Sequence, residues 1–97
     1  MSIHDQLVYG ERIDDLFAAL EAFVHAGSID EDGMFVSSVE LPGQVGQPIL
    51  RALTRVEAEL LLEDAEALRS GCHEDRTSEQ RAADAFVRLA DAVLRFR

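Results

Sequence analysis

The chain has 97 residues, 47% of them hydrophobic, which is enough for one domain with a single core. Its formal net charge is -10, so nucleic acids and anionic membranes would repel it. All nine basic side chains are arginines, and this lack of lysine is typical of GC-rich bacterial genomes. No apolar run is long enough to span a membrane, and the first residues do not resemble a signal peptide. A single cysteine cannot form an internal disulfide. We therefore expect a soluble bacterial protein of the cytoplasm.

The first expected element is a helix over about residues 4–26. Its apolar side chains recur at steps of three and four residues, which places them on one face of an amphipathic helix. Gly27 is well placed to end this helix, and Gly10 makes residues 11–26 its more regular part.

Residues 28–47 are expected to form a hairpin followed by a loop. The segment MFVSSVEL alternates as a short strand does, and Asp32-Gly33 is a favoured two-residue turn that would pair it with residues 28–31. An isolated two-stranded ribbon is marginal in water, so we expect this one to lie against the helices. The proline- and glycine-rich segment 42–48 is typical of a loop.

A second helix is expected over residues 48–70. Pro48 suits its first turn, where a missing N–H removes no hydrogen bond, and Gly71 suits its end. Its apolar surface is broad, because Leu60, Leu61 and Leu62 are consecutive and cannot all point into one small core.

A third helix is expected over residues 77–97. Thr77 and Gln80 match a capping box at its start. Its polar face alternates in sign, with each acid four residues before a base, an order that stabilises helices. The sequence therefore predicts a mainly α fold, a single helical domain over residues 1–97 in which a three-helix bundle carries a short β-hairpin between its first and second helices.

The segment SIDEDGMFV contains the acidic residues and the glycine that open a calcium-binding EF-hand loop. With Gly33 as the sixth residue of such a loop, Asp30 is third and Asp32 is fifth. The first position would then be Ser28, and the twelfth, where the loop needs a bidentate glutamate, would be Val39. We therefore interpret the segment as an acidic hairpin turn, and calcium binding through Asp30 and Asp32 is the alternative.

The loop GCHED contains Cys72 and His73, either of which could ligate zinc. Structural zinc needs four ligands, usually from two separated pairs, and adjacent residues seldom converge on one ion. We interpret this segment as a loop between helices and expect no cofactor. A metal- or ligand-binding role for residues 28–40 or 72–75 is the alternative.

No catalytic motif with a recognisable nucleophile and base occurs in the chain, so we expect no enzyme. Rows of acids such as Glu59, Glu63 and Glu66 usually mark solvated helix faces. They also leave a second alternative, an acidic inhibitor or DNA mimic that binds a basic partner.

The last two helices have more apolar surface than three helices of this length can cover. The surplus side chains, which we expect at an interface, are Leu61, Leu62, Val87 and Leu94. The expected function is that of a protein-protein interaction module with an accessory or regulatory role, which forms a homodimer because two-fold dimers are the commonest oligomers. Its partner would be a second copy or another protein, including one with a basic surface, and neither nucleic acid nor membrane.

Overall fold

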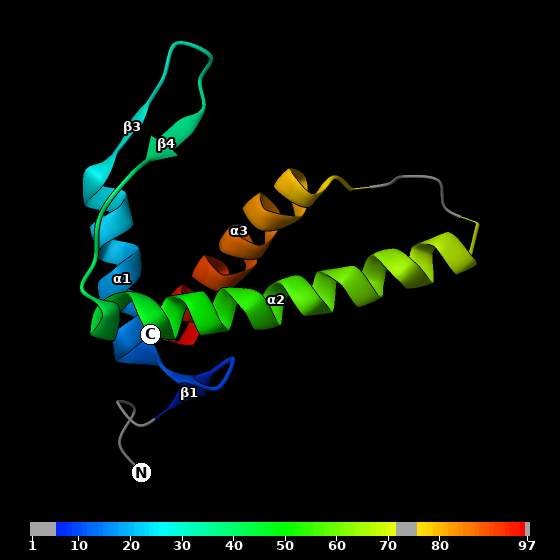
Figure 1. Ribbon diagram of the computed structural model, residues 1–97, viewed down its shortest axis with the longest axis horizontal. Helices are drawn as coiled ribbons and strands as arrows, with labels where there is room; N and C mark the ends of the chain where they lie inside the picture. The colour runs from blue at the N-terminus through cyan, green and yellow to red at the C-terminus, as the bar shows by residue number, and fades with distance from the viewer. Residues whose placement is uncertain (1–5, 72–75, 97) are drawn as a thin grey trace.

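The computed structural model describes residues 6–71 and 76–96, which form three helices and two short antiparallel hairpins (Figure 1). The helices are α1 (Ile13–Ala26), α2 (Gly43–Arg69) and α3 (Ser78–Phe96). One hairpin pairs β1 (Leu7–Val8) with β2 (Glu11–Arg12), and the other pairs β3 (Gly27–Ile29) with β4 (Phe35–Ser37). The predicted mainly α fold, with a short hairpin between the first and second long helices, is confirmed.

The core lies where α1 and α3 pack against the part of α2 that ends near Leu60 (Figure 1). At its edge the rings of Phe23 and Phe86 meet edge to face, with centroids 5.7 Å apart, a favourable geometry for aromatic pairs. No described residue of α2 beyond Leu60 is buried, so the end of this helix projects past the core. The largest side chains with almost no exposed surface are Leu16, Leu60, Leu89, Val56 and Val93.

The segment before α1 is the β1–β2 hairpin, so the prediction of a helix from residue 4 is wrong for residues 6–12. Tyr9 and Gly10 have φ angles of 52° and 81°, the left-handed values that both central residues of a two-residue type I′ turn adopt. A right-handed helix cannot include such residues. The positive φ at position 10 favours glycine, and a Cβ there would also lie 2.8 Å from Nη1 of Arg55, so this guanidinium group would have to shift.

The helix α2 begins at Gly43, so the predictions of a loop over residues 42–48 and of a helix start at Pro48 are wrong. The carbonyl of Pro42 accepts hydrogen bonds from the N–H groups of Val45 and Gly46, both 2.9 Å long, which close the first turn. Pro48 lies inside the helix, where its missing N–H removes one hydrogen bond. Its ring is buried, and this burial offsets the loss.

The predicted C-terminal end of α2 and both predicted ends of α3 agree with the structure to within a residue. Gly71 follows α2 with a φ of 85°, the left-handed conformation that favours glycine after a helix. The capping box of α3 is confirmed: Gln80 N–H donates to Oγ1 of Thr77 at 3.1 Å, and Thr77 N–H donates to Oε1 of Gln80 at 2.9 Å.

The β3–β4 hairpin projects from the end of α1, so the expectation that it lies against the helices is wrong (Figure 1). Its loop is longer than the predicted two-residue Asp32-Gly33 turn, because Ile29 pairs with Phe35. Gly33 N–H donates to the carbonyl of Asp30 at 3.1 Å, and Gly33 alone in this loop has a positive φ, 78°. These are the features of a type I turn followed by a left-handed glycine.

Gly27 joins α1 to the hairpin and lies beneath the ring of Phe35, which a Cβ at position 27 would overlap. We therefore expect Gly27→Ala to displace the ring and loosen the hairpin, increasing amide hydrogen exchange over residues 27–37 about tenfold with little change in the core helices. NMR-detected exchange measures this, and Gly43→Ala is the matched control because a Cβ there has no neighbour within 4 Å. Unchanged exchange in Gly27→Ala would contradict the packing.

The chain is less compact than a single globular domain of its size. Its radius of gyration is 15.0 Å, whereas about 13 Å is typical for this length. Its accessible surface is 6957 Å², whereas a compact monomer of this mass has about 5,500 Å². Within the described part of the chain, the projecting hairpin and the end of α2 contribute to this open shape (Figure 1).

Candidate interaction surface

The four side chains predicted to lie at an interface are all exposed. Leu61 and Leu62 on α2 are 51% and 70% exposed, and Val87 and Leu94 on α3 are 66% and 65% exposed. Neighbouring helical residues are turned by about 100°, so Leu61 and Leu62 face different directions. Val87 and Leu94, seven residues apart, lie on one side of α3.

Other exposed apolar residues of α2 extend the surface beyond the prediction. Leu50 and Leu68 are 64% and 54% exposed and lie on the same side of the helix as Leu61. The sequence contained the signal for this row. Leu61 follows Leu50 by eleven residues and precedes Leu68 by seven, and residues at these spacings lie on nearly the same side of an α-helix. The prolines and glycines around Leu50 concealed it by suggesting a loop.

The β3–β4 hairpin is a third uncovered apolar surface. Four of its apolar side chains are at least half exposed: Ile29, Met34, Phe35 and Val36. The hairpin is tied to the protein at its base, where the Ser37 hydroxyl donates to the carbonyl of Phe23 at 2.7 Å. The chain between residues 26 and 50 contains aspartates and glutamates but no arginine, so this projecting element is acidic as well as apolar.

A buried carboxylate fixes the N-terminal hairpin to α2. The side chain of Glu11 is 9% exposed and accepts two hydrogen bonds from Arg51, at 3.1 and 2.7 Å, and one from Arg55 at 2.8 Å. Arg55 also donates to the carbonyl of Tyr9. The two bonds from Arg51, and then the bond from Arg55, lower the pKa of Glu11 to about 2. Sequence reasoning missed this cluster, whose members are some forty residues apart.

The metal-ligand candidates do not form a cage in the part of the chain that the structure describes. Oδ1 of Asp30 accepts hydrogen bonds from the N–H groups of Asp32 and Met34, both 2.9 Å long, so this carboxylate stabilises the turn. The strand β4 follows where an EF-hand needs a helix. Cys72 and His73 lie outside the described residues. Within residues 6–71 and 76–96 no three His, Cys, Asp or Glu residues are grouped to hold a metal ion.

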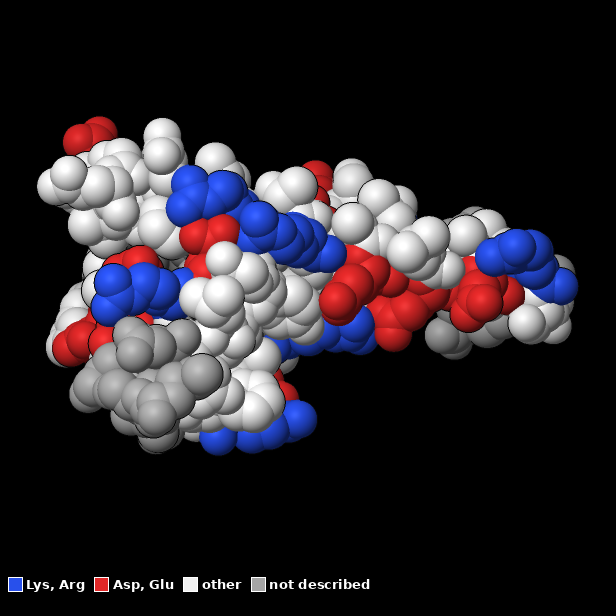
Figure 2. Space-filling model, turned by 90° about the horizontal axis from the view of Figure 1, so that it is seen from below, with Lys and Arg blue, Asp and Glu red and all other residues white. Residues whose placement is uncertain are grey.

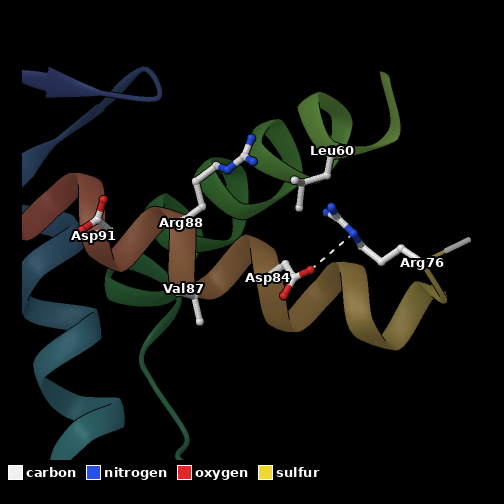
Figure 3. Close-up of a pocket in the computed structure, with 6 residues that line it drawn as sticks. All are labelled: Leu60, Arg76, Asp84, Val87, Arg88 and Asp91. Carbon is white, nitrogen blue, oxygen red and sulfur yellow. Dashed lines mark ion pairs between the residues drawn. The ribbon is translucent and has the colours of Figure 1, made fainter. Parts of the chain in front are cut away.

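A shallow groove of about 420 Å³ runs between α2 and α3 (Figure 3). Nε of Arg76 lies 3.3 Å from Oδ2 of Asp84, while its Nη1 is buried without a hydrogen-bond partner. The close-up shows the side chains of Val87 and Arg88 pointing in opposite directions from α3. Acids and arginines both line the groove, so its charge selects no simple anion or cation. Its lining residues are Leu60, Arg76, Asp84, Val87, Arg88 and Asp91.

Acidic side chains surround most of the arginines on α2 and α3. Nη1 of Arg88 lies 2.9 Å from a carboxylate oxygen of Glu63, a bond that raises the pKa of Arg88. Arg95 and Asp91 form a 2.6 Å pair one helical turn apart. Figure 2 shows basic and acidic side chains side by side over one face of the molecule, so this face has no broad basic patch.

Comparison with family models, with curated proteins and with solved structures finds no match for this chain. Among the described residues, no helix combines the length and the apolar character needed to cross a membrane. The arrangement of residues within the chain is therefore what supports a functional proposal.

Proposed function

We propose that the protein is a non-enzymatic bacterial interaction module of the cytoplasm, in which a three-helix bundle forms a homodimer and has an accessory or regulatory role. One observation carries the proposal: exposed leucines and valines lie in rows on α2 and α3 that the chain itself leaves uncovered. Exposed apolar patches mark interaction sites.

The chemistry of the polar groups supports binding over catalysis. The Ser37 hydroxyl donates to a backbone carbonyl, the Asp30 carboxylate is held in a turn, and Glu11 is held ionised by two arginines. Each of these groups has a structural partner that would compete with a substrate. None is arranged with a neighbouring general base, as an activated nucleophile requires.

Light scattering coupled to size exclusion tests the homodimer. At about 100 µM protein we expect twice the chain mass of 10.7 kDa, because apolar interfaces of standard size commonly bind at micromolar concentrations or below. Leu94→Asp would place a charge in the interface and give the monomer mass, while circular dichroism stays helical. Val24→Asp, at a similarly exposed side chain on α1 outside the rows on α2 and α3, is the control and should remain dimeric. A monomer mass for the unmodified protein at this concentration would overturn the proposal.

The acidic hairpin favours a second candidate, binding of a different protein that has an apolar groove bordered by basic residues. The supporting observation is the combination of half-exposed Phe35 and Val36 with the neighbouring acids Glu31 and Asp32. Such binding would weaken with added salt, whereas self-association through leucines and valines would not.

A further inference from the structure

The outer side of α3 carries a regular apolar row, which we call the α3 outer row: Ala83, Val87, Ala90 and Leu94. Its steps of four, three and four residues are those of the seam along which two helices pack side by side. The buried residues Leu89 and Val93 lie on another side of the helix, facing the core. Ala83, Val87 and Leu94 are exposed, whereas Ala90 is partly buried and packs against the core. Most of the α3 outer row is therefore additional to the surface that holds this domain together.

The α3 outer row complements itself in volume when it is reversed. From Ala83 to Leu94 its side chains are in turn small, large, small and large. In an antiparallel copy Leu94 meets Ala83 and Val87 meets Ala90, so each large side chain faces an alanine. Alternating large and small side chains at facing positions is how packed helices interdigitate.

The charges beside the α3 outer row also complement themselves in the antiparallel orientation. Asp84, Arg88, Asp91 and Arg95 follow one another with alternating sign. Reversal brings Asp84 toward Arg95 of the second copy and Arg88 toward Asp91 of the second copy. A parallel two-fold pair would instead place the two charged sides on opposite sides of the interface, where they could not pair.

The groove between α2 and α3 adjoins the same side of α3. Val87 from the row and Asp84, Arg88 and Asp91 from the charged side all line it (Figure 3). The side chains of Asp84 and Asp91 are 55% and 65% exposed, so they can contact a second molecule without rearranging the core. The groove gives the flank of an incoming helix a place to lie.

We propose that two copies of this chain dimerise by packing the α3 outer rows against each other in antiparallel orientation, Leu94 on Ala83 and Val87 on Ala90. This inference rests on the proposed homodimer and specifies its surface and its geometry. The second copy is the occupant because the row and its flanking charges match themselves in reverse, and any unrelated partner would have to match both by coincidence.

Cysteine cross-linking tests the orientation. In a Cys72→Ser background, Ala83→Cys and Leu94→Cys are prepared separately, one with a mass tag, and oxidised alone and as an equimolar mixture. Antiparallel packing predicts a covalent dimer mainly in the mixture, because position 83 faces position 94 of the second copy. Two copies of position 83 would be about 16 Å apart along the helices, beyond the reach of a disulfide.

Ala82→Cys, one residue off the row, is the matched control and should cross-link to Leu94→Cys far more slowly. Light scattering on the Cys72→Ser protein separates the two proposals. A monomer mass overturns the homodimer itself. If the mass is that of a dimer, the cross-linking results decide the orientation. The antiparallel α3 interface alone is overturned if either cysteine variant cross-links as well alone as in the mixture, or if the mixture does not cross-link. It is also overturned if Ala82→Cys cross-links to Leu94→Cys as fast as Ala83→Cys does.

Discussion

Leu89→Ala is expected to lower the free energy of unfolding by about 3 kcal/mol, because removing a fully buried leucine side chain loses its transfer free energy and leaves a cavity. Leu89 has no exposed surface and belongs to the core formed by all three helices. Domains of this size are stable by roughly 5–15 kcal/mol, so the loss is a large fraction of the total. Urea unfolding followed by circular dichroism measures it.

The control for this core substitution is Val24→Ala, a truncation on α1 at a side chain that is 63% exposed. Its effect should stay below about 0.5 kcal/mol, as is usual for surface positions. Both variants are compared with the parent at one protein concentration, since dimerisation would couple stability to concentration. Equal losses at positions 89 and 24 would contradict the placement of the core.

The three helices could be predicted because their core residues recur with the helical period. Leu16, Leu20 and Phe23 on α1, and Leu89 and Val93 on α3, pack inward as their spacing indicates. The capping box at Thr77 is local, so four residues suffice to predict it. The exposure of Val87 and Leu94 agrees with a surplus of apolar surface, and their binding role stays a prediction.

What the sequence could not predict depends on tertiary contacts. Pro48 lies within a helix because its ring is buried in the core, a gain that local preference does not include. The spacing of Arg51 and Arg55 puts two guanidinium groups on one side of α2, but nothing local identifies Glu11 as their partner. The Asp-Gly pair located the β3–β4 turn correctly, while the pairing of Ile29 with Phe35 set its length.

Glu11→Gln is expected to lower the free energy of unfolding at pH 7 by about 2 kcal/mol. The pKa of Glu11 falls from 4.5 to about 2 on folding, which corresponds to about 3 kcal/mol, and the half-exposed arginines reduce this through solvent screening. Because the folded-state pKa is the lower one, the contribution is fully present above pH 4.5 and is lost as the pH falls toward 2. The difference between parent and variant should therefore be at most about half as large at pH 3 as at pH 7.

Urea unfolding of both proteins at the two pH values checks this pH dependence. Glu31→Gln is the matched control, because Glu31 lies exposed in the β3–β4 loop and its substitution should change stability by less than about 0.5 kcal/mol at either pH. Other carboxylates also become protonated at pH 3, but they do so equally in parent and variant and cancel in the difference. A loss in Glu11→Gln that is the same at pH 3 and pH 7 would mean that shape alone, and no ionic bond to Arg51 and Arg55, holds the N-terminal hairpin on α2.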